Sequence, residues 1–235
     1  MKKLSVIIPA YNEERFIARV LNAVSKVNIP IRMEIIIIND GSTDNTLTEI
    51  NRFLEKNKKS NIPYKLINKP NGGKGSAIRA GIKESTGDII IIQDADLEYD
   101  PRDYLKLIRK IIDKKAMVVY GSRSLNKKNR YSHLSFLLGG KIVTFFTNVL
   151  FFSNLTDEPT CYKVFRADVI KKIKIKGNKF DWEPEVTAKI LKKGIKIHEV
   201  PISYKPRRIE EGKKINWIDG LQAIWTLFYW RFRNS

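Results

Sequence analysis

Short apolar runs alternate with segments of helical periodicity along the first half of the chain. The apolar runs cover residues 4–8, 34–38, 64–68, 88–93 and 116–121. Helical segments are predicted at residues 12–27, 44–57, 76–85 and 101–114. Continuous β-branched runs, such as the four isoleucines at 89–92, are typical of strands buried on both faces of a parallel sheet. This alternation predicts an α/β fold with a mostly parallel, doubly wound sheet.

The isoleucine run changes abruptly into an acidic segment. Carboxylates follow at alternate positions, and Pro101 closes the segment: Asp94, Asp96, Glu98 and Asp100. Such like charges raise one another's pKa values unless a cation lies between them. Hard oxygen ligands suit Mg²⁺ or Mn²⁺, and open α/β sheets bind ligands at the carboxyl ends of their strands. The segment therefore predicts a divalent-metal site, with a solvated acidic turn as the alternative.

Polar clusters follow three of the predicted strands. They are Tyr11/Asn12/Glu13, Asp40/Ser42/Asp44 and Asp94/Asp96. Right-handed crossovers between parallel strands bring these clusters to one edge of the sheet, which is the predicted functional site. A glycine-rich turn at residues 71–76 leads into the third predicted helix. Its backbone N–H groups are predicted either to bind a phosphate or simply to start that helix.

Composition narrows the possible partners. The chain has 235 residues, of which 43% are hydrophobic and 29% are charged, and a formal net charge of +19. Its length suits one α/β domain, and its charge indicates anionic partners such as nucleic acid, acidic lipid or phosphorylated substrates. A single cysteine, Cys161, excludes an internal disulfide and fits a reducing compartment. Two histidines argue against a histidine-based metal site or triad.

Several motifs together carry a resemblance to a known family. Residues 6–13 (VIIPAYNE), 39–44 (NDGSTD) and 94–96 (DAD) resemble the signature of family 2 glycosyltransferases with the GT-A fold, a nucleotide-diphospho-sugar transferase fold. Four later segments are similar to dolichyl-phosphate mannose synthases and bacterial polyprenyl-phosphate glycosyltransferases. These segments are residues 121–123, 156–163, 183–185 and 199–204. The resemblance extends over nearly the whole chain, from about residue 4 to 230.

The resemblance implies roles for individual residues. The nucleotide sugar would be bound by Pro9, Tyr11, Glu13, Asp40, Lys74, Arg79 and Asp94. Asp40 would accept an N–H of the base. The metal would be bound by Asp94, Asp96 and Glu98, and the acceptor phosphate by Arg123, Arg130, Arg207 and Lys213. Glu183 would be a further catalytic residue beside Asp94, Asp96, Arg123, Arg207 and Lys213, with a helix-dipole role for Glu183 as the alternative.

The function implied is inverting transfer of a hexose from GDP-mannose or UDP-glucose to polyprenyl or dolichyl phosphate. Such a transfer needs no strong base, because a phosphate monoester is already anionic near neutral pH. A family 2 enzyme with a non-phosphate glycan or lipid acceptor is one alternative. A nucleotide-sugar pyrophosphorylase is another, although Pro9-Ala10-Tyr11 stands where its glycine-rich loop is expected. A nucleic-acid-binding protein would explain the charge but not the carboxylates at strand ends, so no nucleic-acid partner is expected.

Two apolar stretches bear on the compartment. Residues 134–152 are interrupted by glycines, a lysine and polar residues, and fall short of a membrane-spanning helix. Residues 215–235 combine tryptophan and tyrosine with arginine, which is the composition of an amphipathic interfacial helix. We expect one GT-A catalytic domain over residues 1–235, with a nucleotide-binding half (1–125), an acceptor half (126–214) and this C-terminal helix. No secretory signal is visible, and we expect peripheral association with the cytoplasmic face of a membrane, with a membrane-anchoring partner protein as an alternative.

Overall fold

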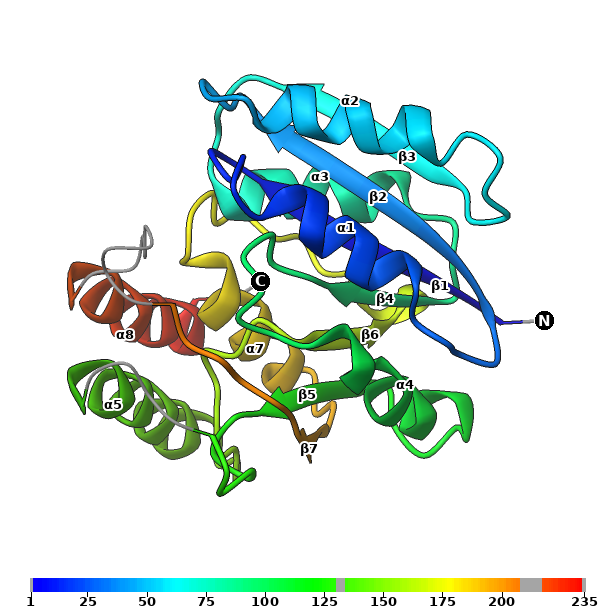
Figure 1. Ribbon diagram of the computed structural model, residues 1–235. Coiled ribbons are helices and arrows are strands. Elements are labelled where there is room, and N and C mark those ends of the chain that lie inside the picture. Colours follow the sequence, from blue (N-terminus) through cyan, green and yellow to red (C-terminus); the bar gives the residue numbers. More distant parts are fainter. Residues whose placement is uncertain (1, 130–133, 208–216, 234–235) are drawn as a thin grey trace.

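The computed structural model describes residues 2–129, 134–207 and 217–233 (Figure 1). Within these residues, seven strands form one sheet in the order β3-β2-β1-β4-β6-β5-β7. The strands are β1 (Lys3–Ala10), β2 (Arg32–Asp40), β3 (Tyr64–Lys69), β4 (Ile89–Ile92), β5 (Val118–Ser122), β6 (Lys163–Arg166) and β7 (Ile197–Pro201). The five strands predicted from the apolar runs are all present.

The sheet is mostly parallel, as predicted. Strands β1 to β4 pair in parallel, and β5 pairs in parallel with β7. The exception is β6, which lies antiparallel between β4 and β5. This strand was not predicted, because its four residues begin with Lys163 and end with Arg166 and so lack a long apolar run. Lys163 is nevertheless fully buried, which no hydropathy pattern would indicate.

Helices connect the strands and extend beyond the sheet. They are α1 (Ile17–Ser25), α2 (Thr46–Lys56), α3 (Lys74–Glu84), the 3-10 turn η1 (Pro101–Asp103), α4 (Tyr104–Ile112), α5 (Leu134–Phe151), α6 (Ala167–Ile170), α7 (Trp182–Lys192) and α8 (Trp217–Phe232). Helix α3 packs on β1 and β2. Helices α5 and α8 lie side by side at the left of Figure 1, and α8 also packs against α7.

The central strands form the core. The four isoleucines of β4 and the isoleucines at 35–38 of β2 are at most 1% exposed. Burying a side chain of this size stabilises the fold by roughly 1.5–3 kcal/mol. This core fixes the ends of β1, β2 and β4, where the predicted site residues lie.

Two predicted helices begin later than expected. Helix α1 begins at Ile17 rather than residue 12, because Asn12 has a positive φ of 50° and cannot continue a helix. The Asn12 side chain instead accepts the backbone N–H of Thr43 at 2.8 Å. Helix α2 begins at Thr46 rather than residue 44, and the carboxylate of Asp44 accepts the N–H of Thr46 at 2.9 Å. The loops after β1 and β2 are therefore bound to each other.

Helices α5 and α8 form a second apolar cluster. Val143 of α5 and Leu227 and Trp230 of α8 pack with Ala188 of α7. No helix in the described parts of the chain is long and apolar enough to cross a membrane. The prediction that residues 134–152 fall short of a membrane span is confirmed. The division of the chain into two halves stays a prediction, since one sheet includes strands from both.

Candidate active site

Carboxylates and cationic side chains meet at the carboxyl ends of β1 and β4. Glu13 follows β1, and Asp94 and Asp96 follow β4. Lys74 is the first residue of α3, and Arg207 comes from the segment after β7. The fold thus brings five of the predicted site residues together, as the topology argument expected.

Lys74 connects two of the predicted acidic residues. Its ammonium lies 2.9 Å from Asp94 and 2.9 Å from Glu183. Burial would lower the pKa of Lys74, but the charges of Asp94 and Glu183 raise it well above its ordinary value. Lys74 therefore stays protonated, and Glu183 belongs to this cluster through an ion pair.

Glu185 has a different role from Glu183. Its carboxylate accepts the backbone N–H groups of Lys176 at 2.9 Å and Gly177 at 2.6 Å, and it pairs with Lys189 at 2.5 Å. Glu185 therefore holds the loop before α7, whereas Glu183, two residues away, faces Lys74.

Arg207 connects the other two acidic residues. Its guanidinium donates to Glu13 at 3.0 Å and to Asp96 at 3.0 Å. Its backbone N–H donates to the carboxylate of Glu98 at 2.7 Å, and the hydroxyl of Tyr204 donates to the same carboxylate at 3.2 Å. Glu98 thus holds the segment 204–207 against the acidic cluster. Direct ligation of a metal by Glu98 stays a prediction.

The acidic pair fits a divalent cation. Burial of Asp96 and the charges of Asp94 and Glu98 raise its pKa to about 7, although Arg207 acts in the opposite direction. This excess of negative charge and the hard oxygen donors suit Mg²⁺ or Mn²⁺. Among the described residues, no three carboxylate, imidazole or thiol side chains are arranged to hold a metal by themselves. A metal bound by Asp94 and Asp96 would therefore take further oxygen ligands from a bound molecule.

Asp40 lies buried at the end of β2, with only 2% of its surface exposed. Its carboxylate pairs with Lys69 and accepts the backbone N–H groups of Gly72 at 3.1 Å and Gly73 at 2.7 Å. Gly73 has a φ of 89°, which a side chain would disfavour. Asp40 thereby fixes the glycine-rich turn that leads into α3.

The glycine-rich turn does not offer a free phosphate cradle in this structure. Besides the two N–H groups bound by Asp40, those of Gly75 and Ser76 donate to backbone carbonyls of the loop before α7, at 3.2 and 3.1 Å. The phosphate interpretation of this motif is therefore wrong for these four N–H groups. Arg79 donates to the carbonyl of Gly177 and to the side chain of Asn178. It anchors the same loop, and its contact with a nucleotide stays a prediction.

Arg123 lies at the end of β5 in a bidentate ion pair. Its guanidinium donates to the two oxygens of Asp157 at 2.8 and 2.7 Å, and its backbone N–H donates to Asp157 at 2.8 Å. The guanidinium also lies 5.2 Å from the ring centroid of Tyr204. Arg123 is thus connected through Tyr204 to Glu98 and the acidic cluster. The predicted acceptor residues Arg130 and Lys213 lie outside the described residues.

The remaining predicted residues line the end of β1. Pro9 is within the strand, and Tyr11 follows it with 38% of its surface exposed. Their contact with a nucleoside stays a prediction.

The sequence did not reveal two ion-pair partners of the predicted site residues. These are Lys69, which pairs with Asp40, and Asp157, which pairs with Arg123. Lys69 is the ladder partner of Asp40 in the parallel pair β2–β3, so the register of the two predicted strands would have revealed it. Asp157 stood inside a recognised motif, but no local pattern indicated its pairing with a residue 34 positions away.

The comparisons with known proteins agree with this geometry. Residues 5–174 match the family described as Glycosyl transferase family 2. Dodecaprenyl-phosphate galacturonate synthase of Rhizobium johnstonii is 28% identical over 212 residues, which cover 87% of this chain and 60% of that protein. Dolichyl-phosphate beta-glucosyltransferase of Dictyostelium discoideum is 31% identical over 216 residues, which cover 86% and 66%. This chain therefore spans less than two thirds of the length of both enzymes.

The fold also matches solved structures. Glucosyl-3-phosphoglycerate synthase of Mycobacterium tuberculosis, in complex with Mn²⁺, UDP and glucosyl-3-phosphoglycerate, superimposes with a TM-score of 0.74. The superposition covers 100% of this chain and 81% of that one, at 16% identity, and shows the fold alone. The family match argues against the pyrophosphorylase and the nucleic-acid-binding protein as alternatives. The chain belongs to glycosyl transferase family 2, with the GT-A fold that its sequence predicted.

Proposed function

We propose that this protein is an inverting glycosyltransferase that moves a hexose from a nucleotide-diphosphate sugar to a polyprenyl or dolichyl phosphate. The observation that carries the proposal is the partly exposed pair Asp94 and Asp96, which form ion pairs with Lys74 and Arg207 at the sheet edge. Two similar proteins are named as enzymes that glycosylate dodecaprenyl or dolichyl phosphate. Those names support the acceptor class.

The donor would lie along the ends of β1, β2 and β4. Pro9, Tyr11, Glu13 and Asp40 would surround the nucleoside, and its diphosphate would extend toward Asp94. Asp94 and Asp96 would hold the Mg²⁺ or Mn²⁺ ion, whose charge stabilises the departing nucleoside diphosphate. Lys74 adds a fixed positive charge on the same side, because its ammonium is already held by Asp94 and Glu183.

The acceptor phosphate needs cationic side chains rather than a base. A phosphate monoester is already anionic near neutral pH, so the chief barrier is its repulsion from the donor diphosphate. Arginine binds phosphate through two parallel N–H groups. Arg123 and Arg207 are the candidates within the described residues, with Tyr204 contacting Arg123 and sharing Glu98 with Arg207.

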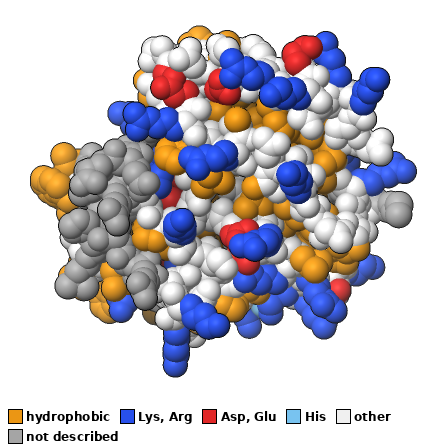
Figure 2. All heavy atoms as spheres, viewed as in Figure 1, with side chains coloured by type: hydrophobic (Ala, Val, Ile, Leu, Met, Phe, Trp, Pro, Cys, Tyr) orange, Lys and Arg blue, Asp and Glu red, His pale blue; other side chains and the backbone are white. Residues whose placement is uncertain are grey.

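The proposal includes peripheral contact with the cytoplasmic face of a membrane. Large apolar side chains of α5 and α8 are exposed, among them Phe145 of α5 and Trp225 and Phe232 of α8. Figure 2 shows apolar side chains at the edge of the molecule where these helices lie, and lysine and arginine over much of the visible face. Anionic lipid attracts such a surface through apolar insertion and charge together. An anchoring partner protein is the alternative.

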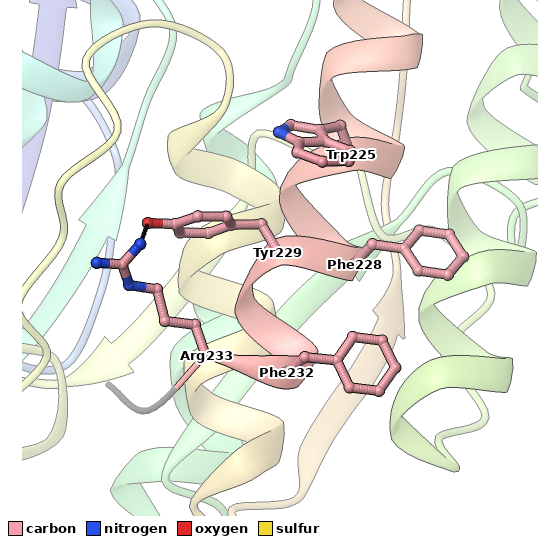
Figure 3. A pocket seen from close by; sticks show the side chains of 5 residues that line it. All are labelled: Trp225, Phe228, Tyr229, Phe232 and Arg233. Atoms are coloured by element: carbon pink, nitrogen blue, oxygen red, sulfur yellow. Dashed lines mark hydrogen bonds between the residues drawn. The ribbon is translucent and has the colours of Figure 1, made fainter.

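The exposed face of α8 contains a shallow hollow of about 680 Å³ (Figure 3). Phe228 and Phe232 extend from the helix toward α5, whereas Tyr229 and Arg233 extend to the other side, where they are hydrogen-bonded. An aromatic surface with a cationic end is the composition expected at the level of lipid headgroups.

A transfer assay tests the proposed function. The protein is incubated with UDP-glucose or GDP-mannose, Mn²⁺ and a short polyprenyl phosphate, and the lipid product is identified by mass spectrometry. We expect a hexosyl phosphodiester of the lipid, lost with EDTA and with Asp96→Asn. Transfer to a glycan or a lipid alcohol, with none to the lipid phosphate, would instead support the non-phosphate acceptor.

A further inference from the structure

Gln93 is a fully buried polar residue at the end of the isoleucine run of β4. Its backbone N–H extends the pairing of β4 with β1 by donating to the carbonyl of Ile7 at 2.9 Å. The next residue is Asp94, the first carboxylate of the acidic segment. Burying a carboxamide is costly unless its hydrogen bonds are made. The partners of the Gln93 side chain therefore indicate why a polar residue stands at this position.

The side-chain oxygen of Gln93 accepts two hydroxyl groups. Tyr104 donates to it at 2.8 Å and Tyr162 at 2.7 Å, and both tyrosines are fully buried. Tyr104 is the first residue of α4, and Tyr162 directly precedes β6. An amide oxygen has two lone pairs, so these two hydroxyls use its whole capacity. The carboxamide is thus held by two separate elements of the fold.

The side-chain nitrogen of Gln93 donates to the backbone carbonyl of Asp94 at 2.9 Å. Because a carbonyl can only accept, the amide nitrogen has to face Asp94 and the amide oxygen has to face the tyrosines. The opposite orientation would bring two oxygens together. Tyr104 and Tyr162 therefore hold the carboxamide, and the carboxamide holds the peptide group that follows Asp94.

The segment that contains the acidic pair is irregular. Strand β4 ends at Ile92, and η1 begins only at Pro101. Within this segment Leu97 has a φ of 60°, a conformation that is unfavourable for a bulky side chain. Such a conformation persists only where the surrounding structure fixes it. The positions of Asp94 and Asp96 therefore depend on contacts from outside the segment.

We propose that Gln93, held by Tyr104 and Tyr162, is a positioning residue that preorganises Asp94 and Asp96 for a divalent cation. It fixes the peptide group at which the chain leaves the sheet, and so sets the direction in which the two carboxylates are presented. The inference rests on the proposed function, which assigns the ion to Asp94 and Asp96. Residues that orient metal ligands contribute about 10- to 100-fold to metal affinity.

A purely structural role is the competing explanation for Gln93. In that case Gln93 only satisfies the buried hydroxyls of Tyr104 and Tyr162. Replacing all partners of a buried hydrogen bond by apolar groups of similar shape can be nearly neutral for stability. The triple variant that combines Gln93→Met, Tyr104→Phe and Tyr162→Phe should therefore keep most of the stability. A structural role predicts unchanged metal affinity in this variant, whereas a positioning role predicts weaker binding, because the carbonyl of Asp94 loses its donor.

Titration of the full chain with Mn²⁺ alone, followed by electron paramagnetic resonance of free Mn²⁺, tests the inference. We expect the triple variant to bind Mn²⁺ about tenfold more weakly than the wild type, with a urea midpoint close to that of the wild type. Tyr120→Phe is the matched control, because the buried hydroxyl of Tyr120 is hydrogen-bonded to Thr187 at 2.9 Å. This control should lose stability and keep its Mn²⁺ affinity.

The outcomes separate the positioning role from the metal site itself. Binding of Mn²⁺ by the folded triple variant as tightly as by the wild type would overturn the role of Gln93 and leave the metal site intact. If the triple variant does not fold, Tyr104→Phe and Tyr162→Phe decide singly, with a smaller loss of affinity expected in each and unchanged affinity in both overturning the inference. Failure of the wild type to bind Mn²⁺ would contradict the proposed metal site, and the positioning role with it.

Discussion

Arg207 lies 3.0 Å from Asp96 and 3.0 Å from Glu13, although 111 and 194 residues of sequence separate these pairs. The guanidinium of Arg207 thus contacts Asp96, one of the two carboxylates that would hold a divalent ion. The same residue is a candidate for the acceptor phosphate. Arg207 cannot keep its hydrogen bond to Asp96 unchanged while a metal ion is bound to that carboxylate. Binding of the metal, the position of Arg207 and binding of the acceptor phosphate are therefore expected to be coupled.

The first prediction follows from that competition. Arg207→Gln should bind Mn²⁺ more tightly than the wild type in the absence of nucleotide, by about tenfold, since a charged hydrogen bond no longer competes for Asp96. Titration followed by electron paramagnetic resonance of free Mn²⁺ measures this. Arg102→Gln is the control, because Arg102 pairs with Asp100 at the surface. Unchanged or weaker Mn²⁺ binding in Arg207→Gln would argue against competition between the Arg207 guanidinium and the metal ion for Asp96.

The second prediction concerns Arg123 and the acceptor. Arg123→Ala should reduce transfer to polyprenyl phosphate more than it reduces hydrolysis of the donor, because the acceptor anion loses its counter-charge. Asp157→Asn should act in the same direction more weakly, since Asp157 holds the Arg123 guanidinium at 2.7 Å. Arg166→Ala, at a surface pair with Asp168, is the control. Equal loss of both reactions in Arg123→Ala would assign Arg123 to the donor.

The third prediction uses Glu34, a buried carboxylate away from the site. Burial would raise the pKa of Glu34, but hydrogen bonds from Lys3, Ser5 and Thr86 lower it to about 2. A lowered pKa stabilises the folded state above the ordinary value near 4.5. This stabilisation is lost as the pH falls toward about 2.

Glu34→Gln should therefore lower the free energy of unfolding by about 1–3 kcal/mol at pH 6. The difference from wild type should shrink as the pH falls below about 4.5. Urea denaturation at several pH values measures both quantities. Glu55→Gln is the control, because its pair with Lys58 is exposed and contributes little. A difference that stays constant down to pH 3 would show that the charge of Glu34 is not its cause.

The fourth prediction concerns the surface of α5 and α8. The protein should bind vesicles that contain anionic lipid, and binding should weaken as salt is added. The double substitution Trp225→Ser and Phe232→Ser should weaken binding without unfolding the protein, since both side chains are mostly exposed. Leu105→Ser, at an exposed position of α4, is the control. Wild-type protein that ignores anionic vesicles at low salt would favour an anchoring partner protein.

Much of the fold could be predicted because its signals are local. The isoleucine runs of β2 and β4 indicate buried parallel strands, and right-handed crossovers then bring Glu13, Asp40 and Asp94 to one edge. Strand β6 could not be predicted in this way. Its fully buried Lys163 is compensated by Glu158, whose backbone carbonyl accepts the ammonium at 2.5 Å, and such a partner appears only in three dimensions.

The candidate site could be predicted only in part, because only some of its residues leave a local signal in the sequence. The carboxylates that follow strands are visible in sequence, whereas their cationic partners come from distant segments. Lys74 could be placed near the nucleotide, but its bridge between Asp94 and Glu183 depends on how α3 and α7 meet. Of the two interpretations of the glycine-rich turn, the structure favours the helix start, because N–H groups of the turn are bound by Asp40 and by backbone carbonyls of residues 178 and 179. No local motif reveals either partner.

We propose that Asp94 and Asp96 together form a divalent-dependent site for a nucleoside diphosphate. The most direct measurement is calorimetric titration of wild type and Asp96→Asn with UDP and GDP, with Mn²⁺ and with EDTA. We predict that the wild type binds one of the two nucleotides only with Mn²⁺, and that Asp96→Asn loses the Mn²⁺-dependent binding while keeping its thermal stability. Binding by Asp96→Asn that is as tight and as dependent on Mn²⁺ as in the wild type would show that Asp96 does not belong to the metal site.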